Sequence, residues 1–289
     1  MDKIIDFKCL SYEDIILNDD ELNSLAITFP QVHCDKEMLI KMAKAIKAKS
    51  KAPYCELPFC HTLEAENLGA KINYGNNVIG PRTGEYLTTN FNDLLTLTEL
   101  NFTSGRMKVV LEAVQELSVN NEVVLLNING PFTILNNLID SKYIFKALRK
   151  ESDLAWTVFA KLQDDLLEYL EVAKKLNVKL ISFADPMGGV DILGPQLMMD
   201  YLEHFVYPFV TKAQEICADK MILNLCPKLT YALTSTNKAY FKDLIFNEPI
   251  TYGEALVSLQ GQGIVVGEMC IQNMNSVLEA NRIKQLILV

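Results

Sequence analysis

Apolar residues in this chain fall into short runs that alternate with longer amphipathic stretches. Several runs are nearly continuous, for example 123–126 and 264–266, as is typical of parallel strands that are covered on both faces. The pattern predicts eight strands, at residues 53–57, 70–74, 122–129, 178–184, 220–226, 242–247, 263–269 and 284–289.

The stretches between the strands have the spacing and length of helices. They predict helices over 35–51, with Asp35 as the N-cap, and over 104–117, 153–176, 197–218 and 251–259, with a break at Pro208. Strands that alternate with helices favour an α/β fold, and eight of them favour closure into a (β/α)8 TIM barrel. We expect a single domain over 1–289, in which residues 1–52 form a short helical N-terminal cover and residues 53–289 form the barrel.

Composition narrows the range of partners and compartments. The net charge of −9 argues against a nucleic-acid-binding surface and against adhesion to an anionic membrane. The seven cysteines are an odd number without regular spacing, which does not predict a disulfide framework. Charged residues interrupt the first ten positions, so no signal peptide is predicted, and no apolar run is long enough to span a bilayer. We expect a cytoplasmic protein without nucleic-acid or membrane partners.

Two cysteines stand where predicted strands end: Cys226 is the last residue of the strand at 220–226, and Cys270 follows the strand at 263–269. The carboxyl ends of all strands in a β/α barrel open onto one face, where chemistry takes place. Two thiols that meet there could hold a soft metal ion such as zinc. The alternative is that both are buried cysteines that act as small hydrophobic residues.

Further polar residues gather just beyond the predicted strands. They are Glu56, His61, Asn129, Asp185, Asn224, Glu248, Glu268 and Gln272. Some have structural alternatives, since His61 could cap the following helix and Asp185 could form a turn. The chain contains neither a GxGxxG nor a GxxxxGK[ST] motif, and no GxSxG elbow, so nucleotide binding and serine hydrolysis have no support.

Three segments, together with Cys226 and Cys270, resemble a known family. They are Leu-Pro-Phe-Cys-His-Thr-Leu-Glu-Ala-Glu-Asn-Leu-Gly-Ala at 57–70, Gly-Pro-Phe-Thr at 130–133 and Phe-Ala-Asp-Pro-Met-Gly-Gly-Val-Asp-Ile-Leu-Gly-Pro at 183–195. This set resembles the uroporphyrinogen decarboxylase superfamily, and within it the corrinoid-dependent methyltransferases of the methylcobalamin:coenzyme M type. The resemblance implies a β/α barrel in which a His-x-Cys pair and a later Cys hold zinc. It also implies that zinc binds the acceptor thiol as a thiolate, which attacks a methyl group on cobalt.

In this chain the matching positions are Asn224, Cys226 and Cys270, so an asparagine stands where the family has histidine. We expect Cys226 and Cys270 to hold zinc, completed by Asn224, Glu268 or another group of the rim such as Glu248 or His61. The alternative is that metal is bound weakly or not at all. The resulting hypothesis is a zinc-dependent methyltransferase that moves a methyl group from methylcobalamin, carried by a corrinoid partner protein, to a small thiol or related acceptor.

The hypothesis assigns roles to the other polar residues. Asp185 and Glu248 are the candidate catalytic residues, and Glu56, His61, Asn129, Asp185 and Gln272 are the candidate substrate-binding residues. One alternative is a barrel that only binds a corrinoid protein or a ligand. Another is a decarboxylase, although residues 1–50 contain no arginine that could bind substrate carboxylates.

Overall fold

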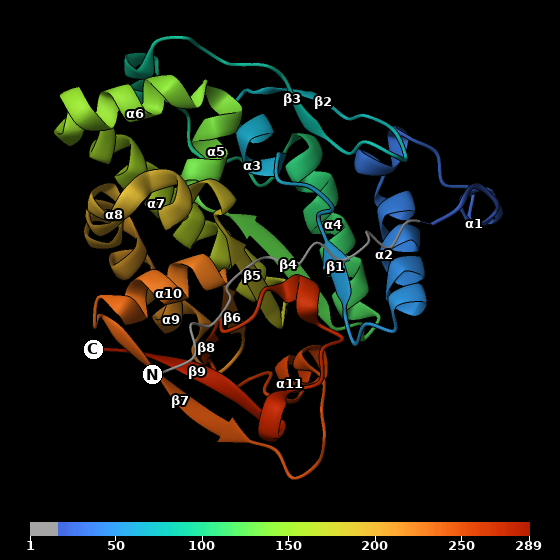
Figure 1. Cartoon of the computed structure of the whole chain (residues 1–289). Helices are drawn as coiled ribbons and strands as arrows, with labels where there is room; N and C mark the ends of the chain where they lie inside the picture. Colours follow the sequence, from blue (N-terminus) through green and yellow to red (C-terminus); the bar gives the residue numbers. More distant parts are fainter. Residues whose placement is uncertain (1–16) are drawn as a thin grey trace.

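A computed structural model describes residues 17–289, and its centre is a mostly parallel sheet surrounded by helices (Figure 1). The strand order within this described part is β1-β4-β5-β6-β8-β9-β7. The strands are β1 (Cys55–Leu57), β4 (Val124–Asn129), β5 (Leu180–Ala184), β6 (Ile222–Leu225), β7 (Ala239–Ile245), β8 (Val265–Val266) and β9 (Arg282–Leu288). The neighbouring strands β1, β4, β5, β6 and β8 pair in parallel. Strand β9 is antiparallel to both β8 and β7.

The α/β fold predicted from the sequence is confirmed, with three corrections to individual strands. The second predicted strand forms β2 (Lys71–Asn73), which pairs with β3 (Arg82–Glu85) in a separate two-stranded sheet. The last predicted strand runs against its neighbours, and the sixth joins the sheet through that reversed strand. Within residues 17–289 no ladder joins β7 to β1.

The structure has helices at all the stretches where the amphipathic pattern predicts them, and it has further helices that were not predicted. The helices are α1 (Asp19–Ser24), α2 (Lys36–Ser50), α3 (Leu63–Asn67), α4 (Gly105–Val119), α5 (Pro131–Leu138), α6 (Ser141–Lys150), α7 (Ser152–Lys175), α8 (Val190–Tyr201), α9 (Tyr207–Cys217), α10 (Pro227–Ser235) and α11 (Tyr252–Ser258). Those that were not predicted include α3, α5, α6 and α10. Asp35 caps α2 by accepting a hydrogen bond from the Met38 N–H at 2.8 Å, as predicted. The expected break at Pro208 is a π-helical turn, Leu202–Val206, between α8 and α9. A proline cannot donate a backbone hydrogen bond, which accounts for the irregular turn just before it.

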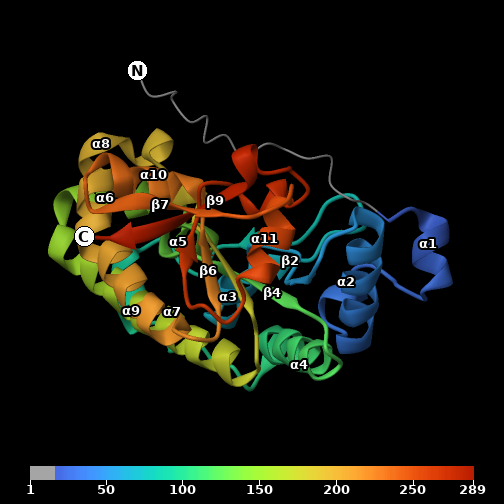
Figure 2. The same ribbon diagram turned by 90° about the horizontal axis from the view of Figure 1, so that it is seen from below.

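The described part of the predicted N-terminal cover is helical. Helix α2 packs against α4 and β1 (Figure 2), and it shares a small apolar cluster with Leu22 and Val32. The first sixteen residues of the predicted cover lie outside the described part of the chain. The boundary at residue 52 between the N-terminal cover and the barrel stays a prediction, as does the single domain over 1–289.

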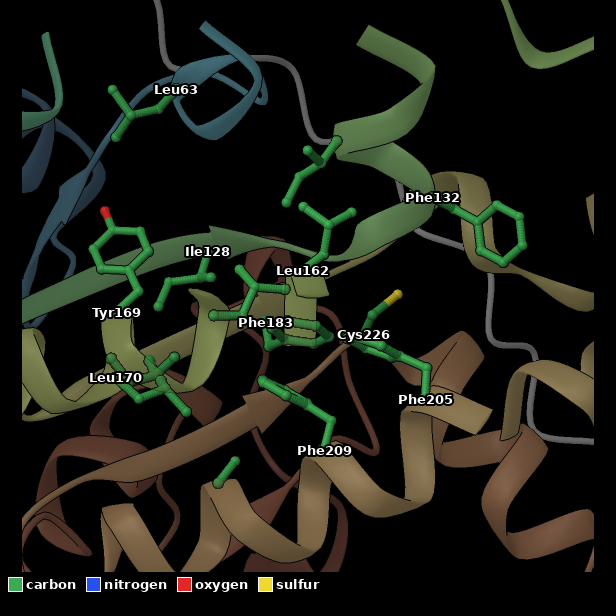
Figure 3. Packing of buried hydrophobic residues seen from close by; sticks show 14 of the residues in the cluster. Leu63, Ile128, Phe132, Leu162, Tyr169, Leu170, Phe183, Phe205, Phe209 and Cys226 are labelled. Carbon is green, nitrogen blue, oxygen red and sulfur yellow. The ribbon is translucent and has the colours of Figure 1, made fainter. Parts of the chain in front are cut away.

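The main hydrophobic core lies between the sheet and the helices α7 and α9. Phe183 on β5 packs against Phe209, with ring centroids 4.5 Å apart, and Phe205 lies beside both (Figure 3). Cys226 lies at the edge of this aromatic cluster (Figure 3). The core therefore fixes the carboxyl ends of β5 and β6, from which the candidate site is built. No helix in the described part of the chain is long and apolar enough to cross a bilayer.

Candidate functional site

A cavity of about 850 Å³ opens at the carboxyl ends of the parallel strands. Strands β1, β4, β5 and β6 contribute Glu56, Asn127, Ser182 and Asn224 to its wall, and the loop after β8 contributes Cys270. This is the face at which parallel α/β folds place their ligands.

The cavity brings together a large part of the residues predicted from the sequence. Its lining includes Glu56, His61, Asn224, Cys226, Cys270 and Gln272. Asn129, Asp185, Glu248 and Glu268 do not line it.

Asp185 is fully buried and forms a closed set of hydrogen bonds. Its carboxylate accepts hydrogen bonds from the backbone N–H groups of Phe132 and Thr133 and from the Thr133 and Tyr201 hydroxyls, at 2.6–3.2 Å. A Cβ at Gly130 would lie 2.5 Å from the Asp185 Cβ, so glycine is required for this close approach. Burial raises the pKa of Asp185, against the effect of these hydrogen bonds. Its catalytic role stays a prediction, and the contacts favour a structural role, tying the turn after β4 to the turn after β5.

The two other predicted carboxylates outside the cavity are held elsewhere. Glu248 is exposed in the segment after β7. Glu268 accepts a hydrogen bond from the Lys284 N–H of β9 at 2.8 Å, and burial raises the pKa of its carboxyl group. Both assignments, Glu248 as catalytic and Glu268 as a metal ligand, stay predictions without a contact to the cavity.

The polar groups around the two thiols fit a zinc ion poorly. The Oδ1 atom of Asn224 accepts a hydrogen bond from the Tyr252 hydroxyl at 2.5 Å, so one of the two lone pairs of the oxygen that would bind metal is already engaged. Within residues 17–289 no group of three or more His, Cys, Asp or Glu side chains is arranged to hold one metal ion. Catalytic zinc sites generally use three protein ligands, and here Cys226 and Cys270 supply only two.

Glu56 is the acidic group that β1 places in the wall of the cavity. The Asn127 amide donates to it at 2.7 Å. Burial raises the pKa of Glu56, while this hydrogen bond and the nearby His61 act in the opposite direction. A buried carboxyl group with a raised pKa in a cavity wall is a candidate functional group.

His61 lies at the start of the α3 region and is linked to a buried carboxylate through Asn129. Its Nδ1 atom lies 2.6 Å from the Oδ1 atom of Asn129. The side-chain and backbone N–H groups of Asn129 donate to the two oxygens of Glu64 at 2.6 and 3.0 Å. Glu64 and Asn129 are almost completely buried. The predicted substrate-binding residue Asn129 therefore contacts the cavity only through His61.

Sequence reasoning missed Arg106 on α4, whose side chain is buried next to the cavity. Its guanidinium donates to Glu66, to the Cys60 sulfur at 3.1 Å and to the Thr62 hydroxyl at 2.9 Å. Burial alone would lower the pKa of Arg106, but Cys60 and Glu66 together keep it above its usual value. Nothing in the helical pattern of 104–117 distinguishes this arginine from an exposed one.

Cavity and fold together define an α/β protein with a candidate ligand-binding cavity at the carboxyl ends of its parallel strands. The chain belongs to the uroporphyrinogen decarboxylase (URO-D) family, whose profile matches residues 15–275. This confirms the resemblance seen in the segments 57–70 and 183–195.

Proteins similar to this chain include methyltransferases from Methanosarcina species. The chain is 23% identical over 233 residues to the methylcobamide:CoM methyltransferase MtaA of Methanosarcina barkeri, covering 79% of this chain and 67% of that protein. It is 19% identical over 253 residues to MtbA of Methanosarcina acetivorans, a methylcobamide:CoM methyltransferase, with 86% and 74% covered.

The fold agrees with a solved structure of the same class. A methyltransferase from Methanosarcina mazei superimposes with a TM-score of 0.63 at 20% identity, covering 76% of this chain and 64% of that one. This chain thus spans a little less than two thirds of that structure. At this identity the likeness supports the fold and does not carry over individual site residues.

Proposed function

We propose that this protein is a methyltransferase that moves a methyl group from a methylated corrinoid, carried by a partner protein, to a small thiol. The observation that carries the proposal is the cavity itself. It lies at the carboxyl ends of the strands in a chain of this family, and Cys226, Cys270, Glu56 and His61 converge on it. Relatives named as methylcobamide:CoM methyltransferases supply the reaction class.

The charges of the cavity support a small thiol over a polycarboxylate substrate. Lys228 and His61 are the basic side chains among the described lining residues, and Lys228 is paired with Asp191 at 2.9 Å. A substrate with many carboxylates needs several arginines or lysines around it. The decarboxylase alternative therefore receives little support from these residues.

Zinc dependence stays a prediction from the family resemblance. Asn224 accepts a hydrogen bond from Tyr252, and Glu268 accepts one from the β9 backbone. Because no third His, Cys, Asp or Glu of residues 17–289 is arranged with Cys226 and Cys270 to hold one metal ion, the residues present do not complete a zinc site around the two thiols. We therefore assign no step of the reaction to a metal. We expect the reaction to take place in the cytoplasm, since seven cysteines without regular spacing do not predict the disulfide framework of a secreted protein.

The cavity residues have separate tasks in this reaction. The apolar wall, including Phe59, Phe183 and Ile271, excludes water and so favours the reaction of a sulfur nucleophile with a methyl carbon. Glu56 and His61 supply proton-exchanging groups beside the acceptor, and Gln272 supplies an amide that can orient it.

The direct test is incubation of the protein with methylcobalamin and a small thiol such as 2-mercaptoethanesulfonate, with the methyl thioether measured by mass spectrometry. We expect formation of the thioether above the uncatalysed rate, in proportion to protein. No catalysed product with either free methylcobalamin or a methylated corrinoid protein would contradict the proposal.

The non-catalytic alternative makes a different prediction for Cys226→Ala. An enzyme should lose methyl transfer in this variant, because Cys226 lines the cavity in which the reaction is proposed to take place. A docking protein would show no transfer in the wild type and would bind a corrinoid protein equally well with and without the substitution.

A further inference from the structure

The anchoring of His61 fixes which of its nitrogens carries the proton. Asn129 donates both its side-chain amide and its backbone N–H to Glu64. The Asn129 nitrogen Nδ2 must therefore point to Glu64, and its oxygen Oδ1 must point to His61 Nδ1, 2.6 Å away. An oxygen accepts here, so Nδ1 must donate and carries a hydrogen in either protonation state of the ring.

The other ring nitrogen, Nε2, is consequently the basic atom of the neutral imidazole. Within residues 17–289 no side chain or backbone group forms a hydrogen bond with it, while the His61 side chain lines the cavity. A histidine whose Nδ1–H is held by an acceptor and whose side chain lines a ligand cavity has the arrangement of a general base.

We propose that His61 is the general base that removes the proton from the acceptor thiol, with Asn129 and Glu64 as its positioning residues. This inference rests on the proposed methyl transfer to a thiol. It also provides a group that can deprotonate the acceptor thiol, which the incomplete zinc site leaves without a metal to do so.

The titratable groups near His61 come from three elements. Glu64 on α3 and Glu56 on β1 both interact electrostatically with His61. Arg106 on α4 is paired with Glu66 and hydrogen-bonded to the Cys60 sulfur.

The reaction balances with the methylated corrinoid as co-reactant. The S–H bond of the acceptor breaks, its proton goes to His61 Nε2, and its electron pair stays on sulfur. The sulfur then bonds to the methyl carbon while the carbon–cobalt bond breaks, and that electron pair remains on cobalt, which is reduced by two electrons. His61 releases its proton to solvent after the thioether leaves.

The pH dependence of His61→Ala tests the proposal sharply. A thiol with a pKa of about 8.5 is only about 3% ionised at pH 7. Without the base only this fraction reacts, so we expect methyl transfer to fall about 30-fold at pH 7. We expect the deficit to shrink to less than about 2-fold at pH 9.5, where the thiol ionises by itself.

Two further variants and one control separate positioning from folding. Asn129→Leu should show the same pH-dependent deficit, because the ring loses its orienting acceptor, and Glu64→Gln should show a smaller one, because it keeps hydrogen-bonding groups and removes the charge. The matched control is His204→Gln, since His204 is exposed and stacks on Trp156 away from the cavity. Circular dichroism melting curves establish that each variant is folded before it is assayed.

A measurement that needs no activity tests the same geometry. Long-range ¹H–¹⁵N correlation spectra should show His61 with its hydrogen on Nδ1 at a pH where the ring is neutral. A hydrogen on Nε2 would overturn the inference, as would a His61→Ala deficit that stays constant from pH 7 to pH 9.5. If the wild type itself forms no methyl thioether at any pH, the proposed function fails and the inference fails with it.

Discussion

Replacing Asp185 by Asn tests whether this buried carboxylate is structural. Its Oδ1 atom accepts hydrogen bonds from the Thr133 N–H at 2.7 Å and the Thr133 hydroxyl at 2.6 Å. Its Oδ2 atom accepts from the Phe132 N–H at 3.2 Å and the Tyr201 hydroxyl at 2.6 Å. Asparagine has nearly the same shape, but one of these oxygens becomes an NH₂ group that cannot accept.

The cost follows from counting the bonds that asparagine loses. If the new NH₂ group takes the place of Oδ2, the Tyr201 hydroxyl can rotate and accept a hydrogen bond from it, whereas the Phe132 N–H can only donate and loses its acceptor. An unsatisfied buried donor costs about 1–3 kcal/mol. The remaining bonds lose their charge assistance, and removal of the buried charge returns part of its desolvation cost. We expect a net loss of about 2–4 kcal/mol in the free energy of unfolding, or a melting temperature lower by about 4–12 °C.

Thermal unfolding monitored by circular dichroism measures this loss, with Asp164→Asn as the matched control. Asp164 is an exposed carboxylate on α7, and its substitution should change the melting temperature by less than about 2 °C. Methyl transfer per folded molecule should be retained in Asp185→Asn. An unchanged melting temperature combined with a more than tenfold loss of transfer would refute the structural role and support the catalytic one.

Three further predictions concern other buried groups. The pKa of His33 is lowered to about 4 by burial and by the nearby Arg106. Its folded-state pKa lies below the unfolded value, so the free energy of unfolding should fall by no more than about 2 kcal/mol as the pH drops from 7 to 5. Over the same pH range, the melting temperature of His33→Phe should drop less than that of the wild type. Arg106→Lys should lower the unfolding free energy in urea by about 2–4 kcal/mol, because lysine cannot replace all three hydrogen bonds; no change would contradict the pairing described. Asn224→His should raise bound zinc toward one per chain by elemental analysis, whereas the cavity control Asn127→His should not; equal zinc in both variants would argue against a site at Cys226 and Cys270.

Much of the fold followed from local pattern, and the exceptions have a common cause. The near-continuous apolar runs at 122–129, 178–184 and 220–226 are central parallel strands, because such runs need cover on both faces. The direction of β9 and the separate pairing of β2 with β3 depend on which neighbours each strand meets. A pattern of apolar positions does not carry that information.

In the candidate site, too, the positions of some residues follow from the strand pattern, whereas those of others depend on tertiary packing. The two cysteines reach the cavity because both follow parallel strands that end at the same face. Asp185 also follows such a strand, yet it turns inward, because Gly130 and Gly188 leave room for its side chain against the backbone. Glu64 resembles an exposed helix charge in the sequence and is completely buried instead. Burial of single charged residues on short helices depends on tertiary packing.

The claim on which the account depends is that methyl transfer takes place in the cavity at the carboxyl ends of the strands. A single-turnover reaction with CD₃-labelled methylcobalamin and a small thiol tests it when the wild type is compared with Ala184→Leu, since Ala184 lines the cavity on β5. The account predicts CD₃-thioether from the wild type and at least tenfold less from the filled variant at equal folded concentration. Equal amounts of labelled product from both proteins would contradict it.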